Sequence, residues 1–337
     1  MQLVISGACT GLWTVNRIAG VQTVKSEELT MSEILTLWNE TSAKKTIIDY
    51  VNSITNPESA NFVPETERIA ILDNDGTMWV EKPVYVQVFF IIDRLKQMAE
   101  ADPTLLSQPH FKAAAMGDFT YFSRLDPHAG GDVKKLMKIV FDSHAGMSQD
   151  DFMLMAKEFL DTAKHPRFGM LYRDLTYKPM VELVHYLGDN GVKVFLASGG
   201  GMSFIRTVSE EIYKIPRERV IGSNVAFETR MTDEGPVVFR RRGLVDPIDD
   251  GAGKPVNIEL HIGRKPILAA GNSDGDLHML WLAQKSGYRS LSLLLRHDDA
   301  EREYAYNGGS EKALQMAKER GWIMVSMKDD WKAVFKD

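Results

Sequence analysis

Short apolar runs alternate with amphipathic stretches along the second half of the chain. Runs of this length without polar interruption are typical of buried parallel strands, which need helical crossovers between them. The pattern therefore predicts an α/β fold with a doubly wound, parallel, Rossmann-like sheet. The expected strands are 69–73, 192–197, 219–222, 266–270, 289–295 and 322–326, and the expected helices of this region are 178–189, 203–213, 255–261, 276–285 and 310–320.

The region before residue 178 has a different pattern. Residues 103–165 contain helical segments broken by proline and glycine, and nothing in them is typical of a strand. Pro83 is expected to open a helix, and residues 43–54 predict another with one apolar face. We expect a Rossmann-like catalytic core of residues 66–81 and 176–337, an inserted helical cap of residues 82–175, and an N-terminal tail and helices, residues 1–65, on the core.

A hairpin interrupts the alternation of strands and helices. Residues 225–231 and 236–241 flank a Thr-Asp-Glu-Gly turn at 232–235, which predicts two antiparallel strands. The triplet Arg240–Arg242 beside this hairpin is interpreted as a solvated surface feature, because an isolated triplet does not make a nucleic-acid site.

Composition excludes several classes of protein. The 337 residues are 44% hydrophobic and 26% charged, with a net charge of −6. These values are typical of a soluble globular protein, and the acidic balance disfavours a nucleic-acid partner. A single cysteine, Cys9, excludes an intrachain disulfide and a cysteine-based metal site. There is no apolar run of 18 residues, so no membrane-spanning segment is expected.

The compartment and the oligomeric state stay open. The first 22 residues lack the basic and apolar regions of a good signal peptide. We expect a soluble protein that is cytoplasmic, or exported to the periplasm if a signal peptide lies upstream.

Two carboxylates follow the first predicted strand, in Asp73-Asn74-Asp75-Gly76-Thr77. Their charges would repel each other in a buried site, and a bound divalent cation would relieve that repulsion. Mg²⁺ prefers carboxylate and carbonyl oxygens together with substrate phosphate. One carboxylate can then attack phosphorus while the other protonates the leaving oxygen. The alternative is a turn that uses aspartate and glycine for its geometry alone.

Three further segments supply groups suited to a phosphate and a cation. Ser198 and the glycines at 199–201 follow a strand and precede a helix, where backbone N–H groups suit a phosphate. Lys254 stands before a short predicted helix and can neutralise phosphate charge. Residues 271–276, Gly-Asn-Ser-Asp-Gly-Asp, offer oxygen ligands after another strand. Because parallel strands end at one edge of the sheet, these segments are expected to meet.

In this order the motifs resemble those of the haloacid dehalogenase-like superfamily of phosphohydrolases, and most closely its phosphoserine-phosphatase-like branch. The resemblance covers residues 66–335 in organisation. It implies Asp73 as the nucleophile and Asp75 as the general acid and base, with Ser198 and Lys254 also catalytic. It implies phosphate or substrate contacts from Thr77, Gly199, Gly200, Glu81 and Trp79. The implied Mg²⁺ ligands are Asp73, Asp75, Asn272 and Asp276.

The resemblance implies a Mg²⁺-dependent phosphatase that hydrolyses a small phosphorylated metabolite through a phospho-aspartyl intermediate. Asp75 disfavours a dehalogenase, because halide departure needs no proton donor. The superfamily usually has Asp where this chain has Asn272, and Glu81 is one residue out of register with the phosphoserine-binding Glu. The alternatives are therefore a phosphoserine phosphatase or phosphotransferase of the same fold, and a non-catalytic protein that binds a phosphate ligand. The eight histidines are interpreted as structural or surface residues.

Overall fold

The central sheet has eight strands in the order β4-β3-β2-β1-β5-β6-β7, with β8 also paired to β6. The computed structural model describes residues 33–125 and 130–335, so the tail expected in residues 1–32 lies outside the described residues. All neighbours pair in parallel except β3 with β4 and β6 with β7. The strands are β1 (Ile69–Leu72), β2 (Lys193–Gly201), β3 (Val220–Thr232), β4 (Gly235–Val245), β5 (Leu268–Gly271), β6 (Leu291–Asp298), β7 (Ala305–Tyr306) and β8 (Ile323–Ser326).

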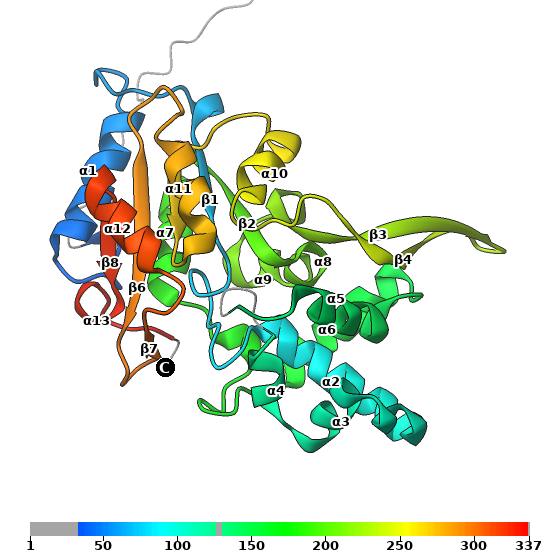
Figure 1. The fold of residues 1–337 in the computed structure, drawn as a ribbon. Helices are drawn as coiled ribbons and strands as arrows, with labels where there is room; N and C mark the ends of the chain where they lie inside the picture. Colours follow the sequence, from blue (N-terminus) through cyan, green and yellow to red (C-terminus); the bar gives the residue numbers. More distant parts are fainter. Residues whose placement is uncertain (1–32, 126–129, 336–337) are drawn as a thin grey trace, which may run out of the picture.

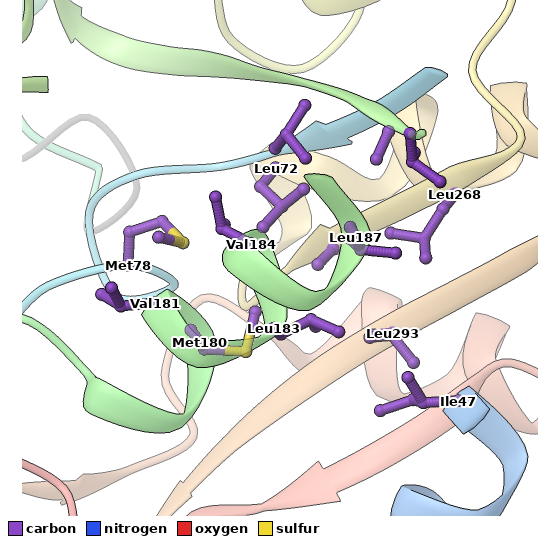
Figure 2. Close-up of a cluster of buried hydrophobic side chains, with 14 of the residues drawn as sticks. Ile47, Leu72, Met78, Met180, Val181, Leu183, Val184, Leu187, Leu268 and Leu293 are labelled. Carbon is purple, nitrogen blue, oxygen red and sulfur yellow. The ribbon is translucent and has the colours of Figure 1, made fainter. Parts of the chain in front are cut away.

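Helices cover both faces of this sheet, because successive strand residues point to opposite sides and both sides are apolar (Figure 1). In β1, Leu72 faces α1 (Ser42–Thr55) and α7 (Lys178–Asp189), whereas Ile71 faces the opposite helices. Figure 2 shows Val184 and Leu187 of α7 close to the strand side chains Leu72 and Leu268. The opposite face is covered by α10 (Gly253–His261), α11 (Leu277–Ala283) and α12 (Glu311–Arg320). The predicted doubly wound parallel fold is confirmed.

The chain between β1 and α7 forms helices that Figure 1 shows grouped beyond one edge of the sheet. No strand occurs in the described part of residues 103–165, as predicted. The helix expected from Pro83 begins instead at Val86, because Tyr85 keeps an extended backbone with φ −54° and ψ 144°. These inserted helices are α2 (Val86–Ala101), α3 (Pro109–Met116), α4 (Phe119–Ser123), α5 (Val133–His144) and α6 (Gln149–Thr162).

The hairpin is longer than the sequence predicts. Strand 219–222 and the first hairpin strand form one continuous strand, β3, which pairs with β2 in its first residues and with β4 beyond Asn224. The hairpin projects away from the body of the molecule (Figure 1). The helix expected at 203–213 is divided into α8 (Met202–Arg206) and α9 (Ser209–Tyr213), because Val208 leaves the helical conformation. A short helix, α13 (Met327–Asp330), follows β8. None of the helices in the described ranges is long and apolar enough to cross a membrane.

Candidate active site

The chemical groups predicted from the sequence meet at the carboxyl ends of three adjacent strands. Strand β1 lies between β2 and β5, so the loop that begins at Asp73 lies between Ser198 and the segment that begins at Asn272. The Asp73 amide donates to the carbonyl of Ala270 on β5 (2.9 Å). Ligands of open parallel sheets bind at this edge.

Lys254 lies at the centre of this group. Its Nζ donates to Asp73 Oδ1 (2.6 Å), to Asp276 Oδ1 (2.6 Å) and to the carbonyl of Ala197 (2.8 Å). The side chain is buried, and these three bonds use all the donors of an ammonium group. Lys254 lies in the first turn of α10 and not before the helix as predicted. Gly253 permits this placement, since a Cβ there would lie 1.9 Å from the carbonyl oxygen of Ile248.

Asp75 is held by two side-chain donors. Trp79 Nε1 donates to its Oδ1 (2.9 Å), and Ser198 Oγ donates to its Oδ2 (3.2 Å). The Gly200 amide in turn donates to Ser198 Oγ (3.0 Å). Burial raises the pKa of Asp75 above its usual range, although the bonds from Trp79 and Ser198 oppose this shift. A raised pKa suits a carboxyl group that must carry a proton at neutral pH.

The site holds more negative than positive charge. Asp73 and Asp276 both contact the Lys254 ammonium group, and Asp75 lies close enough to feel its charge. Burial and the nearby Asp276 raise the pKa of Asp73 against the opposing effect of Lys254. Burial opposes the charge of Lys254, but Asp276 and Asp73 raise its pKa above the usual value.

This donor set fits Mg²⁺ in its chemistry. Hard carboxylate oxygens in excess over one ammonium group are what a divalent cation would neutralise. Within the described residues, no three histidine, cysteine, aspartate or glutamate side chains form a preformed metal cluster. A Mg²⁺ ion held there would need further oxygens from water and substrate phosphate, which usually complete its shell.

Asn272 belongs to a buried hydrogen-bond network behind Asp73. Its Oδ1 accepts from Thr77 Oγ1 (3.2 Å), and its Nδ2 donates to Glu81 Oε1 (3.2 Å). Gly76 has a φ of +76°, and a Cβ there would lie 2.1 Å from Asn272 Nδ2. Asn272 therefore lies so close to the loop of residues 73–77 that only glycine fits opposite it.

The remainder of this network was not predicted from the sequence. Tyr306 on β7 donates its hydroxyl to Glu81 Oε1 (2.6 Å). Nε2 of His297 lies 2.9 Å from the carbonyl oxygen of Gly76, and its Nδ1 lies 3.1 Å from Glu303 Oε2. These residues stand in no recognisable motif, and β7 has only two residues. Only their neighbours in the fold identify them as part of the site.

A cavity of about 210 Å³ opens over the strand ends. Its polar floor includes most of the predicted residues: Asp73, Asp75, Glu81, Gly199, Gly200, Lys254 and Asp276. Thr77, Trp79, Ser198 and Asn272 do not line it. Thr77 and Trp79, expected to contact substrate or phosphate, are buried and bond to Asn272 and Asp75 instead.

Arg240 corrects the interpretation of the basic triplet as a solvated feature. Its side chain is buried, at 6% exposed, and lines the cavity, whereas Arg241 and Arg242 are exposed. The reason is its contact with α6: the guanidinium lies 3.7 Å from the centre of the Phe152 ring.

Comparisons with known proteins bear on the fold. No protein-family model matches the sequence, and no curated protein matches it. The structure is similar to that of a conserved protein of unknown function from Anaerococcus prevotii, at 16% identity and a TM-score of 0.55, over 86% of this chain and 93% of that one.

Two further similar structures have TM-scores below 0.5. One is a phosphoserine phosphohydrolase-like protein from Francisella tularensis (16% identity, TM-score 0.42, 77% of this chain and 94% of that one). The other is cytosolic 5'-nucleotidase IIIB bound to cytidine (15% identity, TM-score 0.46, 88% of this chain and 92% of that one). At these identities the likeness to the Anaerococcus protein shows a shared fold and assigns no substrate.

Proposed function

We propose that this protein is a Mg²⁺-dependent phosphatase that hydrolyses a small phosphomonoester through a phospho-aspartyl intermediate. The observation that carries the proposal is the contact of Lys254 with Asp73 beside an Asp75 held by Ser198. A nucleophile next to a cation, with a second carboxyl group two residues later, is the arrangement that phosphoryl transfer to aspartate requires. The resemblance of the motifs to haloacid dehalogenase-like phosphohydrolases supports the same assignment.

The proposed reaction has two steps. In the first, a carboxylate oxygen of Asp73 attacks phosphorus, the bond from phosphorus to the ester oxygen breaks, and Asp75 gives its proton to the departing alkoxide. In the second, Asp75 takes a proton from water, and the resulting hydroxide attacks phosphorus and releases inorganic phosphate from Asp73. Lys254 stabilises the charge on the phosphoryl oxygens through its own positive charge, and the Gly199 amide beside Ser198 is proposed to donate to them.

Mg²⁺ would be held by oxygen atoms of Asp73, Asp75, Asn272 and Asp276, with Asp75 contributing its backbone carbonyl. When bound, it would neutralise the phosphoryl group and the excess of carboxylate charge. The Asn272 side chain already bonds Thr77 and Glu81, and both oxygens of Asp276 already accept hydrogen bonds. Asp73, which accepts from Lys254 at Oδ1, is therefore the strongest candidate for a direct ligand.

The inserted helices are proposed to act as a cap that excludes water and selects the substrate. Gln87 on α2 reaches across to the glycine loop, where its Oε1 accepts a hydrogen bond from the Gly201 amide (2.6 Å). This contact joins the proposed cap to the glycine loop, close to Asp75, because a Cβ on Gly200 would lie 3.4 Å from both Asp75 Oδ2 and Gln87 Oε1.

The test is hydrolysis of p-nitrophenyl phosphate between pH 5 and 8, with Mg²⁺ and with EDTA. We expect metal-dependent turnover in the wild type and a loss of at least 1,000-fold in Asp73→Asn, because the amide is not a nucleophile. Asp49→Asn, an exposed change on α1, is the control and should keep wild-type turnover. Turnover that persists in Asp73→Asn would overturn the proposed mechanism.

A non-catalytic phosphate-binding role is the alternative, and the engagement of Asn272 with Thr77 and Glu81 is what favours it. Beryllium trifluoride with Mg²⁺ separates the two roles, because it mimics a phosphoryl group on aspartate. A rise in melting temperature that Asp73→Asn abolishes supports the phospho-aspartyl site. A rise with inorganic phosphate, but with neither beryllium trifluoride nor turnover, supports binding alone.

A further inference from the structure

Arg240 on β4 places a buried positive charge in the wall of the cavity, and its known contacts are neutral. Its Nη1 donates to Gln149 Oε1 (3.0 Å), and its guanidinium lies over the ring of Phe152. A guanidinium group has five N–H donors arranged as a planar fork that fits a carboxylate or a phosphate. The amide and the ring leave its charge unmatched.

The neighbours of Arg240 on the same strand are matched to carboxylates. Arg241 lies 3.3 Å from Glu228, and Arg242 donates to Asp142 Oδ1 (2.7 Å). Among residues 33–125 and 130–335, no Asp or Glu carboxylate pairs with Arg240. Burial lowers the pKa of Arg240 to about 10, which still leaves it charged at neutral pH. The strand therefore has carboxylate partners for its exposed arginines and none for the buried one.

Apart from its polar floor and Arg240, much of the cavity wall is apolar. It is formed by side chains of α2, α5, α8 and β4, which include Val88, Ile91, Leu136, Val140, Phe204 and Leu244. Such a surface favours a hydrocarbon chain or ring in the part of the cavity away from its carboxylates.

We propose that Arg240 is a specificity-determining residue that binds a second anionic group of the substrate, a carboxylate or a phosphate, at the far end of an apolar body. The substrate class is then a phosphomonoester whose hydrocarbon portion separates two anions. The assignment rests on the proposed phosphatase function and adds the substrate class to it.

The experiment compares esters that share a primary alkoxide leaving group and differ only at the far end. These are hexyl phosphate, 6-phosphonooxyhexanoate and 1,6-hexanediol bisphosphate, with the four- and eight-carbon analogues, and kcat/KM is measured by phosphate release. In the wild type we expect a preference of at least tenfold for one anionic tail. The preferred tail distinguishes a carboxylate from a phosphate as the natural group.

Arg240→Met should reduce that preference to less than threefold, and Arg240→Lys should keep part of it. Arg230→Met is the matched control: Arg230 also lies over a ring, that of Phe239 (4.3 Å), but is exposed and pairs with Glu228. It should keep the full preference. A wild-type preference near one at every chain length, or a preference that survives in Arg240→Met, would overturn the proposal.

Binding of non-hydrolysable ligands separates this proposal from the phosphatase function. Calorimetry compares hexylphosphonate with 6-phosphonohexanoate, and hexylphosphonate with 1,6-hexanediphosphonate, on the wild-type protein. At least tenfold tighter binding of a doubly anionic ligand supports the role of Arg240 even if no ester is hydrolysed, in which case only the phosphatase function fails. Equal affinity within each pair overturns the role of Arg240 whether or not hexyl phosphate is hydrolysed.

Discussion

Asn272 donates its side-chain amide to the Glu81 carboxylate across 3.2 Å. The same carboxylate oxygen accepts from the Tyr306 hydroxyl, and burial raises the pKa of Glu81 above its usual range. An amide at position 272 can donate to Glu81, whereas a carboxylate cannot. Asn272 stands where the motif that this sequence resembles usually has Asp. Its amide is therefore suited to donate to the carboxylate of Glu81, which an aspartate could not do.

The first prediction is that Asn272→Asp destabilises the protein in a pH-dependent way. Two buried carboxylates would then face each other, so the pKa of at least one rises further and the folded state disfavours ionisation. The variant should therefore be about as stable as the wild type at pH 4.5 and become less stable as pH rises. At pH 8 we expect its free energy of unfolding to be about 1–3 kcal/mol lower than that of the wild type. Urea unfolding at the two pH values measures this difference.

Glu81→Gln provides the control for that prediction. The double variant Asn272→Asp with Glu81→Gln restores a donor opposite the new carboxylate and should recover most of the loss at pH 8. A loss of the same size at both pH values, or no rescue by Glu81→Gln, would show that the facing charges are not its cause.

Lys254→Met is predicted to destabilise the site by about 3–5 kcal/mol at pH 8, because it leaves Asp73 and Asp276 buried without their cation. Without the lysine the pKa of Asp73 rises further, so protonation at pH 5 should reduce the loss. Lys44→Met is the matched control. Lys44 is equally buried, but its partner Glu40 is exposed, and we expect about 1 kcal/mol or less from that pair. Chemical denaturation at pH 5 and pH 8 compares them.

Trp79→Phe is predicted to move the basic limb of the kcat/KM profile to higher pH. Burial raises the pKa of Asp75, and the Trp79 hydrogen bond opposes this by stabilising the charged form. Its loss should raise the pKa of Asp75 further, because a hydrogen bond to a charged group is worth about 1.5–3 kcal/mol. Trp38→Phe removes a similar bond, to the carbonyl of Pro179, and should leave the limb in place. A shift to lower pH would contradict the assignment of Asp75 as the acid.

His144 is predicted to make stability depend on pH. Burial, assisted by Arg240 and Arg94, lowers the pKa of His144 to about 3, and its ring is stacked on Phe90. Because the folded pKa is depressed, the stability it contributes is present above pH 6.5 and is lost as pH falls towards 3. Relative to His144→Gln, the wild type should lose about 1.4 kcal/mol per pH unit in that window. His185→Gln, an exposed change, should run parallel to the wild type.

The sheet could be predicted from the sequence because its signal is local. Each of β1, β2, β5 and β6 is a short apolar run with both faces buried, as parallel strands between helices must be. The start of α2 was predicted three residues early because proline favours the first turn of a helix in general, whereas Tyr85 here is held extended. The two-residue strand β7 has too little length to leave a pattern.

The polar cluster at the strand ends could also be predicted, because Asp73, Ser198 and Asp276 follow predicted strands and Lys254 stands beside a predicted helix. The residues that form the walls of the cavity could not be predicted in this way. Arg240 belongs to a triplet of identical arginines that differ only in the residues that each contacts in the folded protein. Tyr306 donates to Glu81, which lies 225 positions away in the sequence. Such partners are set by tertiary packing, which a local pattern does not record.

The bonds of Lys254 are expected to make the floor of the cavity more stable against local opening than its walls. Its bonds to Asp73, Asp276 and the carbonyl of Ala197 tie the ends of β1 and β2 to the loop after β5. Amide hydrogens at this edge should therefore exchange with solvent as slowly as those of the inner strands, through global unfolding. In the walls, the hairpin is joined to α5 by an ion pair between Asp142 and the exposed Arg242, which stabilises little, so these amides should exchange through smaller openings. Under the proposed function, ligand would then exchange through local opening of the walls while Asp73 and Lys254 stay in place.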